Sequence, residues 1–157
     1  MLLLIFQSGE DRYGLDASRI IEVVPLASLK HVPHAPEGMA GLLNYRGTIV
    51  PVMDLSALLT GTPSRARLST RIVLVDVSPE DSPAPRILGF MAERVTETIR
   101  YREQDLQVSG VAVPGAPYLG KIMLDQYAMV QRIDPAAVIP ESLKATLFAL
   151  AKESNHD

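Results

Sequence analysis

The chain has 157 residues, with 15 Lys and Arg against 18 Asp and Glu, for a net charge of −3. This length fits one ordinary domain or two small halves that share a core, and it disfavours a multidomain enzyme. The acidic balance disfavours nucleic acid as a partner. The chain contains no Cys, which excludes a disulfide framework, a zinc ribbon and a thiolate nucleophile. The N-terminal apolar run, residues 2–6, is too short for a signal peptide. We therefore expect a cytoplasmic protein.

Short apolar runs separated by Gly, Pro, Asp and Ser are typical of an all-β domain. In the first half they predict a hairpin, an edge strand that ends near Pro25, and a second hairpin that turns at Arg46 and Gly47. A single helical turn is predicted to follow. The corresponding residues are 2–7 and 12–16 for the first hairpin, 20–26 for the edge strand, 39–45 and 48–54 for the second hairpin, and 55–59 for the turn.

The second half repeats this pattern and then changes at its end. Strands are expected at residues 71–77, 86–93, 94–101, 118–124 and 127–133. In 94–101 the apolar side chains alternate with polar ones, so one face of that strand should meet water. After Pro140, leucines at positions 143, 147 and 150 have helical spacing, which predicts a helix over 140–152.

The stretch from residue 60 to residue 70 has no apolar period and predicts a boundary between two halves. Its arginines, together with the one that follows at position 71, are interpreted as part of a solvated linker. Two sets of about five short strands each predict two small β-barrels packed side by side. The predicted organisation is a single domain over 1–157, with subdomains at 1–62 and 68–134 and the C-terminal helix at 140–152.

The residues offer little chemistry. His31 and His34 lie in a proline-bound extended segment, and no Cys or nearby pair of carboxylates completes a coordination set, so a metal site is disfavoured. No serine lies in a Gly-x-Ser-x-Gly elbow. Gly110, Gly115 and Gly120 lack the Lys-Ser/Thr ending of a phosphate loop. The residues alone therefore favour a binding module without catalysis, metal or cofactor.

One segment carries a resemblance to a known family. It is GLLNYRGTIVPVMDL at residues 41–55, where an Asn and an Arg interrupt two apolar strands at their shared turn. The segments YGLD at 13–16, IIEV at 20–23 and P-x-x-P at 33–36 precede it in matching order. Together these motifs resemble the CheW-like family of bacterial chemotaxis adaptors. The resemblance is strong over residues 6–59 and weaker beyond.

The resemblance implies a fold of two five-stranded SH3-like barrels with a C-terminal helix. It also implies a non-enzymatic adaptor that links the cytoplasmic tip of a methyl-accepting chemoreceptor to the regulatory domain of a CheA-type histidine kinase. Such an adaptor would be recruited to membrane-bound receptor arrays without inserting into the membrane. By position, the residues expected to bind receptor or kinase are Ile20, Glu22, Gly41, Asn44, Arg46 and Gly47.

Other interpretations of these residues remain open. Arg46 could instead cap carbonyls at a strand end, with Asn44 satisfying the turn, and Glu22 could be an ordinary outward residue of its strand. Finer motifs, including Phe6-Gln7 and APYLG at 116–120, resemble the Wsp-type adaptors, whose arrays are coupled to a diguanylate cyclase. The alternative function is a small-ligand-binding barrel with a pocket lined by Tyr13, His34 and Tyr45. An enzyme is the least favoured class.

Overall fold

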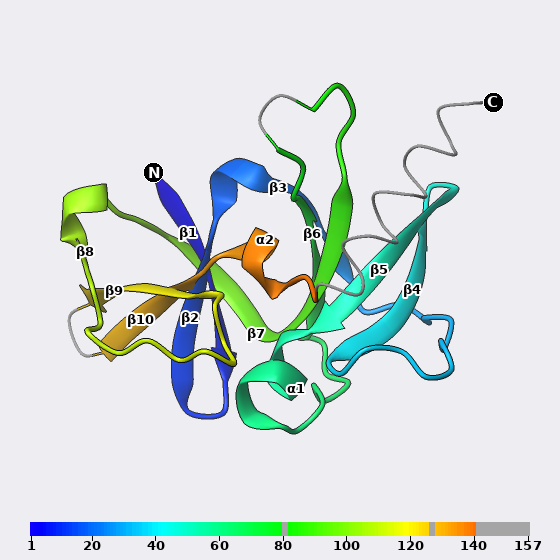
Figure 1. The fold of residues 1–157 in the computed structure, drawn as a ribbon, viewed down its shortest axis with the longest axis horizontal. Coiled ribbons are helices and arrows are strands. Elements are labelled where there is room, and N and C mark those ends of the chain that lie inside the picture. Colours follow the sequence, from blue (N-terminus) through cyan, green and yellow to red (C-terminus); the bar gives the residue numbers. More distant parts are fainter. Residues whose placement is uncertain (80–81, 126–127, 141–157) are drawn as a thin grey trace.

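The computed structural model describes residues 1–79, 82–125 and 128–140, in which ten strands dominate two short α-helices and two 3₁₀ turns (Figure 1). The predicted all-β class is confirmed. In chain order the elements are β1 (Leu2–Ser8), β2 (Asp11–Asp16), η1 (Ala17–Arg19), β3 (Ile20–Pro25), β4 (Met39–Tyr45), β5 (Thr48–Asp54), α1 (Leu55–Thr60), β6 (Arg71–Asp76), β7 (Ile87–Arg100), η2 (Glu103–Asp105), β8 (Leu106–Gln107), β9 (Leu119–Asp125), β10 (Ala128–Ile133) and α2 (Pro135–Val138).

Most predicted elements lie where the sequence patterns placed them. The hairpin β4–β5 has the predicted bounds, and the helical turn after it is observed as α1. Pro25 is the last residue of β3, as expected for a residue that cannot donate to a sheet. The predicted C-terminal helix, 140–152, lies outside the described residues except for Pro140. No helix in the described part of the chain is long and apolar enough to cross a membrane.

The strands form two groups that share β7. Residues 87–92 of β7 pair with β6, and residues 93–100 pair with β1. We call sheet A the group of β1, β2, β8, β9, β10 and the C-terminal half of β7, and sheet B the group of β3, β4, β5, β6 and the N-terminal half of β7. In Figure 1 the two groups lie on either side of β7.

The sheets do not follow the predicted division at residues 60–70. Sheet A takes β1 and β2 from the start of the chain and joins β2 in parallel to β10, with Val130 opposite Arg12. β1 pairs antiparallel with β7, Leu2 lying opposite Arg100. These long-range pairings bring the two ends of the chain together in sheet A, whereas sheet B is built from the continuous stretch from β3 to the first half of β7, which runs across residues 60–70.

The two predicted strands 86–93 and 94–101 are one strand, β7, which bends where it passes from sheet B to sheet A. Opposite Ile5 and Gln7 of β1 lie Glu97 and Glu93 of β7, so the register shifts through a bulge. Arg94, inside this bulge, has a φ of 49°. That value lies in the left-handed region that non-glycine residues seldom occupy.

Apolar side chains fill three clusters. The largest draws residues from both sheets and from both helices, so it is a core shared between the sheets; two smaller clusters lie within sheet A and sheet B respectively. Burial of this apolar surface is the main force that holds the fold together. Representative members are Phe6, Met53, Phe90 and Ile133 of the shared core, Ile5, Met123 and Val130 of sheet A, and Val50, Ile72 and Leu74 of sheet B.

Candidate functional site

The turn between β4 and β5 is a two-residue hairpin loop at Arg46 and Gly47. Both residues have positive φ, 50° and 86°, as in a type I′ turn, whose twist matches that of the flanking strands. The Asn44 side-chain Oδ1 accepts a hydrogen bond from the Gly47 N–H at 2.9 Å. The turn therefore holds Arg46 away from the sheet, with its side chain 75% exposed.

Three side chains meet beside this turn, and we call them the turn cluster: Glu22, Tyr45 and Arg46. The Tyr45 hydroxyl donates to Glu22 Oε2, and Arg46 Nη2 lies 3.4 Å from the same oxygen. The Arg46 guanidinium carbon also lies 5.1 Å from the centre of the Tyr45 ring, within the range of a cation–π contact. The hydrogen bond to Glu22, followed by partial desolvation, raises the pKa of the Tyr45 hydroxyl.

The strands that carry the turn cluster also expose apolar side chains. Ile21 and Val23 of β3 are 43% and 40% exposed, and Ile49, opposite Asn44 in the hairpin, is 72% exposed. Because side chains alternate along a strand, these three lie on the outer faces of β3 and of the hairpin, opposite to the faces of Glu22 and Tyr45. Exposed apolar side chains of this kind are typical of protein-binding surfaces. The sequence predicted Tyr45 only as a lining residue of the alternative ligand pocket, and it did not single out Ile49. The signal that could have found Ile49 is its place next to the turn, where an isoleucine has no core to enter.

The structure brings four of the six expected binding residues to this end of sheet B and leaves two elsewhere. Glu22, Asn44, Arg46 and Gly47 form or border the turn cluster. Ile20 packs instead against the shared core, opposite Val75 of β6.

Gly41 is buried within β4 and serves the backbone. A Cβ atom at this position would lie 2.6 Å from the Lys30 carbonyl oxygen. Lys30 and Leu42 exchange two backbone hydrogen bonds, of 2.8 and 2.9 Å, across this close approach. Gly41 therefore allows the segment after β3 to pack onto β4.

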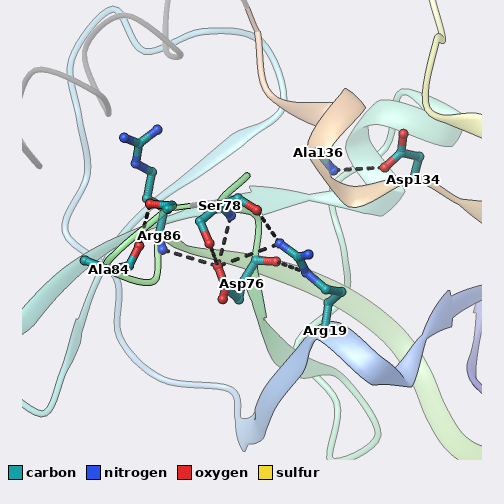
Figure 2. A network of polar contacts seen from close by, with 8 residues as sticks. Arg19, Asp76, Ser78, Ala84, Arg86, Asp134 and Ala136 are labelled. Carbon is teal, nitrogen blue, oxygen red and sulfur yellow. Dashed lines mark hydrogen bonds and ion pairs between the residues drawn. The ribbon is translucent and has the colours of Figure 1, made fainter. Parts of the chain in front are cut away.

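A second polar network joins η1 to the end of β6 (Figure 2). Arg19 Nε donates to the Asp76 carbonyl oxygen at 2.9 Å, and Arg19 Nη2 donates to the Ser78 carbonyl oxygen. The Asp76 side-chain Oδ1 accepts from the backbone N–H groups of Ser78, at 2.9 Å, and of Arg86, at 3.3 Å. The network closes the loop between β6 and β7 and fastens it to η1.

An open cavity of about 390 Å³ lies next to this network, between the end of β6 and α2. Arg19, Pro79 and Pro135 are among its lining residues. Asp134, also in the lining, accepts the Ala136 N–H at 3.2 Å and so caps α2. The side chains of Arg19, Asp76 and Asp134 at this cavity thus make hydrogen bonds within the protein.

The Asp76 network predicts a pH dependence of stability. Partial burial alone would raise the pKa of the Asp76 carboxyl, but the hydrogen bonds from Ser78 and Arg86 and the nearby Arg19 lower the pKa overall. A lowered pKa in the folded state stabilises the protein above the unfolded-state value of about 4, and this contribution is lost as the pH falls through the folded-state pKa. We expect Asp76→Asn to be less stable than the wild type at pH 7 and the two to converge in acid, as measured by urea unfolding. A difference in the free energy of unfolding between the two proteins that stays the same from pH 7 into acid would contradict this prediction.

The histidines and the three residues proposed for a ligand pocket are not assembled into a site. His31 and His34 line a separate hollow of about 280 Å³ with Pro36, and the described residues contain no group of three or more side chains able to hold a metal ion. Tyr13 stacks on Phe6, with ring centres 5.7 Å apart. Tyr13 also packs against the shared core and Tyr45 belongs to the turn cluster, so neither of the two cavities described above is lined by Tyr13, His34 and Tyr45 together.

Comparison with known proteins identifies the family. The model of the CheW-like domain matches residues 2–142. The chemotaxis protein CheW of Treponema pallidum is 27% identical, with 78% of each chain covered. CheW of Helicobacter pylori is also 27% identical, with 64% of this chain and 58% of that protein covered. The crystal structure of the scaffolding protein TtCheW from Thermoanaerobacter tengcongensis has a TM-score of 0.73 and 26% identity, covering 85% of this chain and 84% of the other. The chain belongs to the CheW-like domain family.

Proposed function

We propose that this protein is a non-catalytic adaptor that couples a methyl-accepting chemoreceptor to a CheA-type histidine kinase. The observation that carries the proposal is the turn cluster, an exposed charged group at the β4–β5 turn, on strands that also expose apolar side chains on their outer faces, in a member of the CheW-like family. A related structure is described as that of a scaffolding protein. An adaptor needs surfaces of this kind and no reactive groups.

Within this function, the six expected residues take different parts. Glu22 and Arg46 present charge to the partner, and the Arg46 guanidinium provides directional hydrogen-bond donors for an acceptor on it. Asn44 and Gly47 fix the shape of the turn. Ile20 and Gly41 support the surface without contacting the partner. Ile20 packs against the shared core, and Gly41 allows the close approach of the Lys30 backbone.

The adaptor acts by bivalent attachment. Two individually weak contacts, one to receptor and one to kinase, make the second binding event intramolecular and raise its effective concentration. Through these contacts the protein is recruited from the cytoplasm to receptor arrays at the membrane. The signal then passes as a shift in the activity equilibrium of the kinase.

Reversing the charge of Arg46 tests the proposal. In Arg46→Glu a second carboxylate replaces the cation beside Glu22, so we expect about tenfold weaker binding of a receptor cytoplasmic fragment and a matching loss of receptor-dependent kinase stimulation. The double variant Glu22→Arg/Arg46→Glu restores an internal ion pair with reversed polarity. It should remain defective if the charges face a partner, and recover if they serve only the fold. Unchanged binding and stimulation in Arg46→Glu would exclude Arg46 from the contact.

We further propose that the array has the Wsp-type output, a diguanylate cyclase response regulator. The support is the similarity of short motifs, among them Phe6-Gln7 and APYLG at 116–120, to adaptors of that type. Co-purification from cell extract would identify the output by the response regulator that accompanies the kinase. Recovery of a flagellar-motor regulator alone would overturn this assignment and leave the adaptor function intact.

A further inference from the structure

The segment after α1 is held in a fixed shape against the bulge of β7. The Arg65 N–H donates to Glu93 Oε1 at 2.9 Å, and the Val95 N–H donates to the Ser69 carbonyl oxygen at 3.1 Å. Inside the segment, buried Thr70 donates from its N–H to the Arg67 carbonyl oxygen and from its hydroxyl to the Arg65 carbonyl oxygen, at 3.0 and 2.6 Å. These bonds fix the backbone on both sides of Leu68.

This fixed segment presents an apolar side chain among cations. Leu68 is 94% exposed. Arg65 and Arg67 are exposed, as is Arg94 in the adjoining bulge. In the described part of the chain none of these three guanidinium groups has an ion-pair partner; Arg94 donates to the Gln7 amide oxygen at 3.2 Å. The carboxylate that contacts the segment, Glu93, already accepts the Arg65 N–H.

We propose that Arg65, Arg67, Leu68 and Arg94, which we call the basic loop surface, form a docking site for an acidic segment of a partner protein. The segment would carry two or more carboxylates beside an apolar side chain. This goes beyond the proposed coupling through the turn cluster. The turn cluster lies at the start of β5, and the basic loop surface lies beyond the end of β5. β5 has seven residues, so its two ends are about 20 Å apart. In Figure 1 the segment after α1 lies at the lower edge of the fold, beside β7.

The chemistry of the surface favours carboxylates on a protein. All three cations are arginines, whose planar guanidinium groups bind carboxylates through two parallel hydrogen bonds. Leu68 supplies one apolar anchor, and its fixed backbone lowers the entropy lost on binding. The whole chain has a net charge of −3, so the positive surface is local and is not a general property of the protein. Nucleic acid would also attract the arginines but would give the exposed Leu68 no specific partner. An acidic membrane would attract them without needing a segment whose backbone is fixed in one shape.

The test uses a fluorescent peptide of alternating glutamate and leucine, and the same peptide with glutamine in place of glutamate. We expect the full-length protein to bind only the acidic peptide, by fluorescence anisotropy, and binding to weaken about tenfold in Arg67→Glu and in Leu68→Ser. The matched control is Arg100→Glu, which makes the same charge change at another exposed arginine of β7 and should alter binding by less than about twofold. Circular dichroism checks that each variant is folded.

Three results would overturn the proposal: no binding of the acidic peptide, equal weakening by Arg100→Glu and Arg67→Glu, or binding that Leu68→Ser does not change. Phosphatidylserine vesicles and a DNA duplex are assayed in parallel. If either binds with dependence on Arg67 while the peptide does not, the surface serves that ligand and the proposal is wrong. Arg46→Glu, which tests the turn cluster, should leave peptide binding unchanged, so failure of one proposal is distinguishable from failure of the other.

Discussion

Replacing Gly41 with alanine is expected to lower the free energy of unfolding by about 3 kcal/mol. Gly41 has a φ of 148°, and a methyl group there would lie 2.6 Å from the Lys30 carbonyl oxygen and 3.0 Å from the Leu29 Cβ. The contact with Lys30 is with backbone, which cannot move aside as a flexible side chain can. The substitution should therefore separate the Lys30 segment from β4 and break its two hydrogen bonds with Leu42.

Two further glycine substitutions separate this clash from other effects. Gly47 has a φ of 86°, but a Cβ atom added there would meet nothing within 4 Å, so Gly47→Ala should cost about 1 kcal/mol through backbone strain alone. Gly115 has an open environment and no positive φ, so Gly115→Ala should be nearly neutral. Urea unfolding of the three variants gives the comparison. A Gly41→Ala variant no less stable than Gly47→Ala would contradict the close approach to Lys30.

Local patterns were sufficient to predict the β4–β5 hairpin. Its strands are apolar over their length, and the pair Arg46 and Gly47 between them satisfies the requirement of a tight turn for positive φ. The strand bounds depend only on neighbouring residues, which is why they were predicted correctly. The same holds for α1, where Asp54 caps the first turn and Gly61, with a φ of 78°, ends the helix.

The arrangement of the strands could not be predicted from such patterns. In the parallel pairing of β2 with β10, Arg12 lies opposite Val130. Nothing in the sequence of either strand identifies the strand with which it pairs. The boundary at residues 60–70 was predicted because that stretch has no apolar period. The lack of a period indicates a loop, but it does not identify the strands with which the strands before and after the loop will pair. The continuity of β7 through its bulge was missed because Arg94 interrupts the pattern at the point where the strand changes sheets.

The candidate site was predicted in part, through the family resemblance. Position identified Glu22 and Arg46, and the structure places their charges 3.4 Å apart. Tyr45 was predicted only as a lining residue of the alternative ligand pocket, because the sequence does not show that its hydroxyl reaches Glu22. Arg65 and Arg67 were interpreted as a solvated linker, since the sequence does not reveal the hydrogen bonds that fix their segment against β7.

The Asp54 carboxylate should be the most important single polar group for the fold of this region. Asp54 is only 5% exposed, and its Oδ1 accepts the Ser56 N–H at 3.0 Å, capping α1. Its Oδ2 accepts the Ser64 N–H at 2.8 Å, and the Ser64 hydroxyl donates to Oδ1 at 2.6 Å. One buried side chain thus holds both the start of α1 and the segment that leads to the basic loop surface. Because Asp54→Ala leaves these donors without an acceptor, we expect it to lower the free energy of unfolding by about 3 kcal/mol.

Comparison with an exposed helix cap shows whether the hydrogen bonds from Ser64, in addition to the capping of α1, make Asp54 important for stability. Asp134 caps α2 through the Ala136 N–H in an exposed position, so Asp134→Ala should cost only about 1 kcal/mol. Asp54→Ser can still cap α1, but its shorter side chain should not reach Ser64, so its stability should lie between that of the wild type and that of Asp54→Ala. Equal losses in Asp54→Ala and Asp134→Ala, measured by urea unfolding, would show that capping alone accounts for Asp54. If instead Asp54→Ser also weakens binding of the acidic peptide, the attachment to Ser64 is what positions the arginines of the basic loop surface.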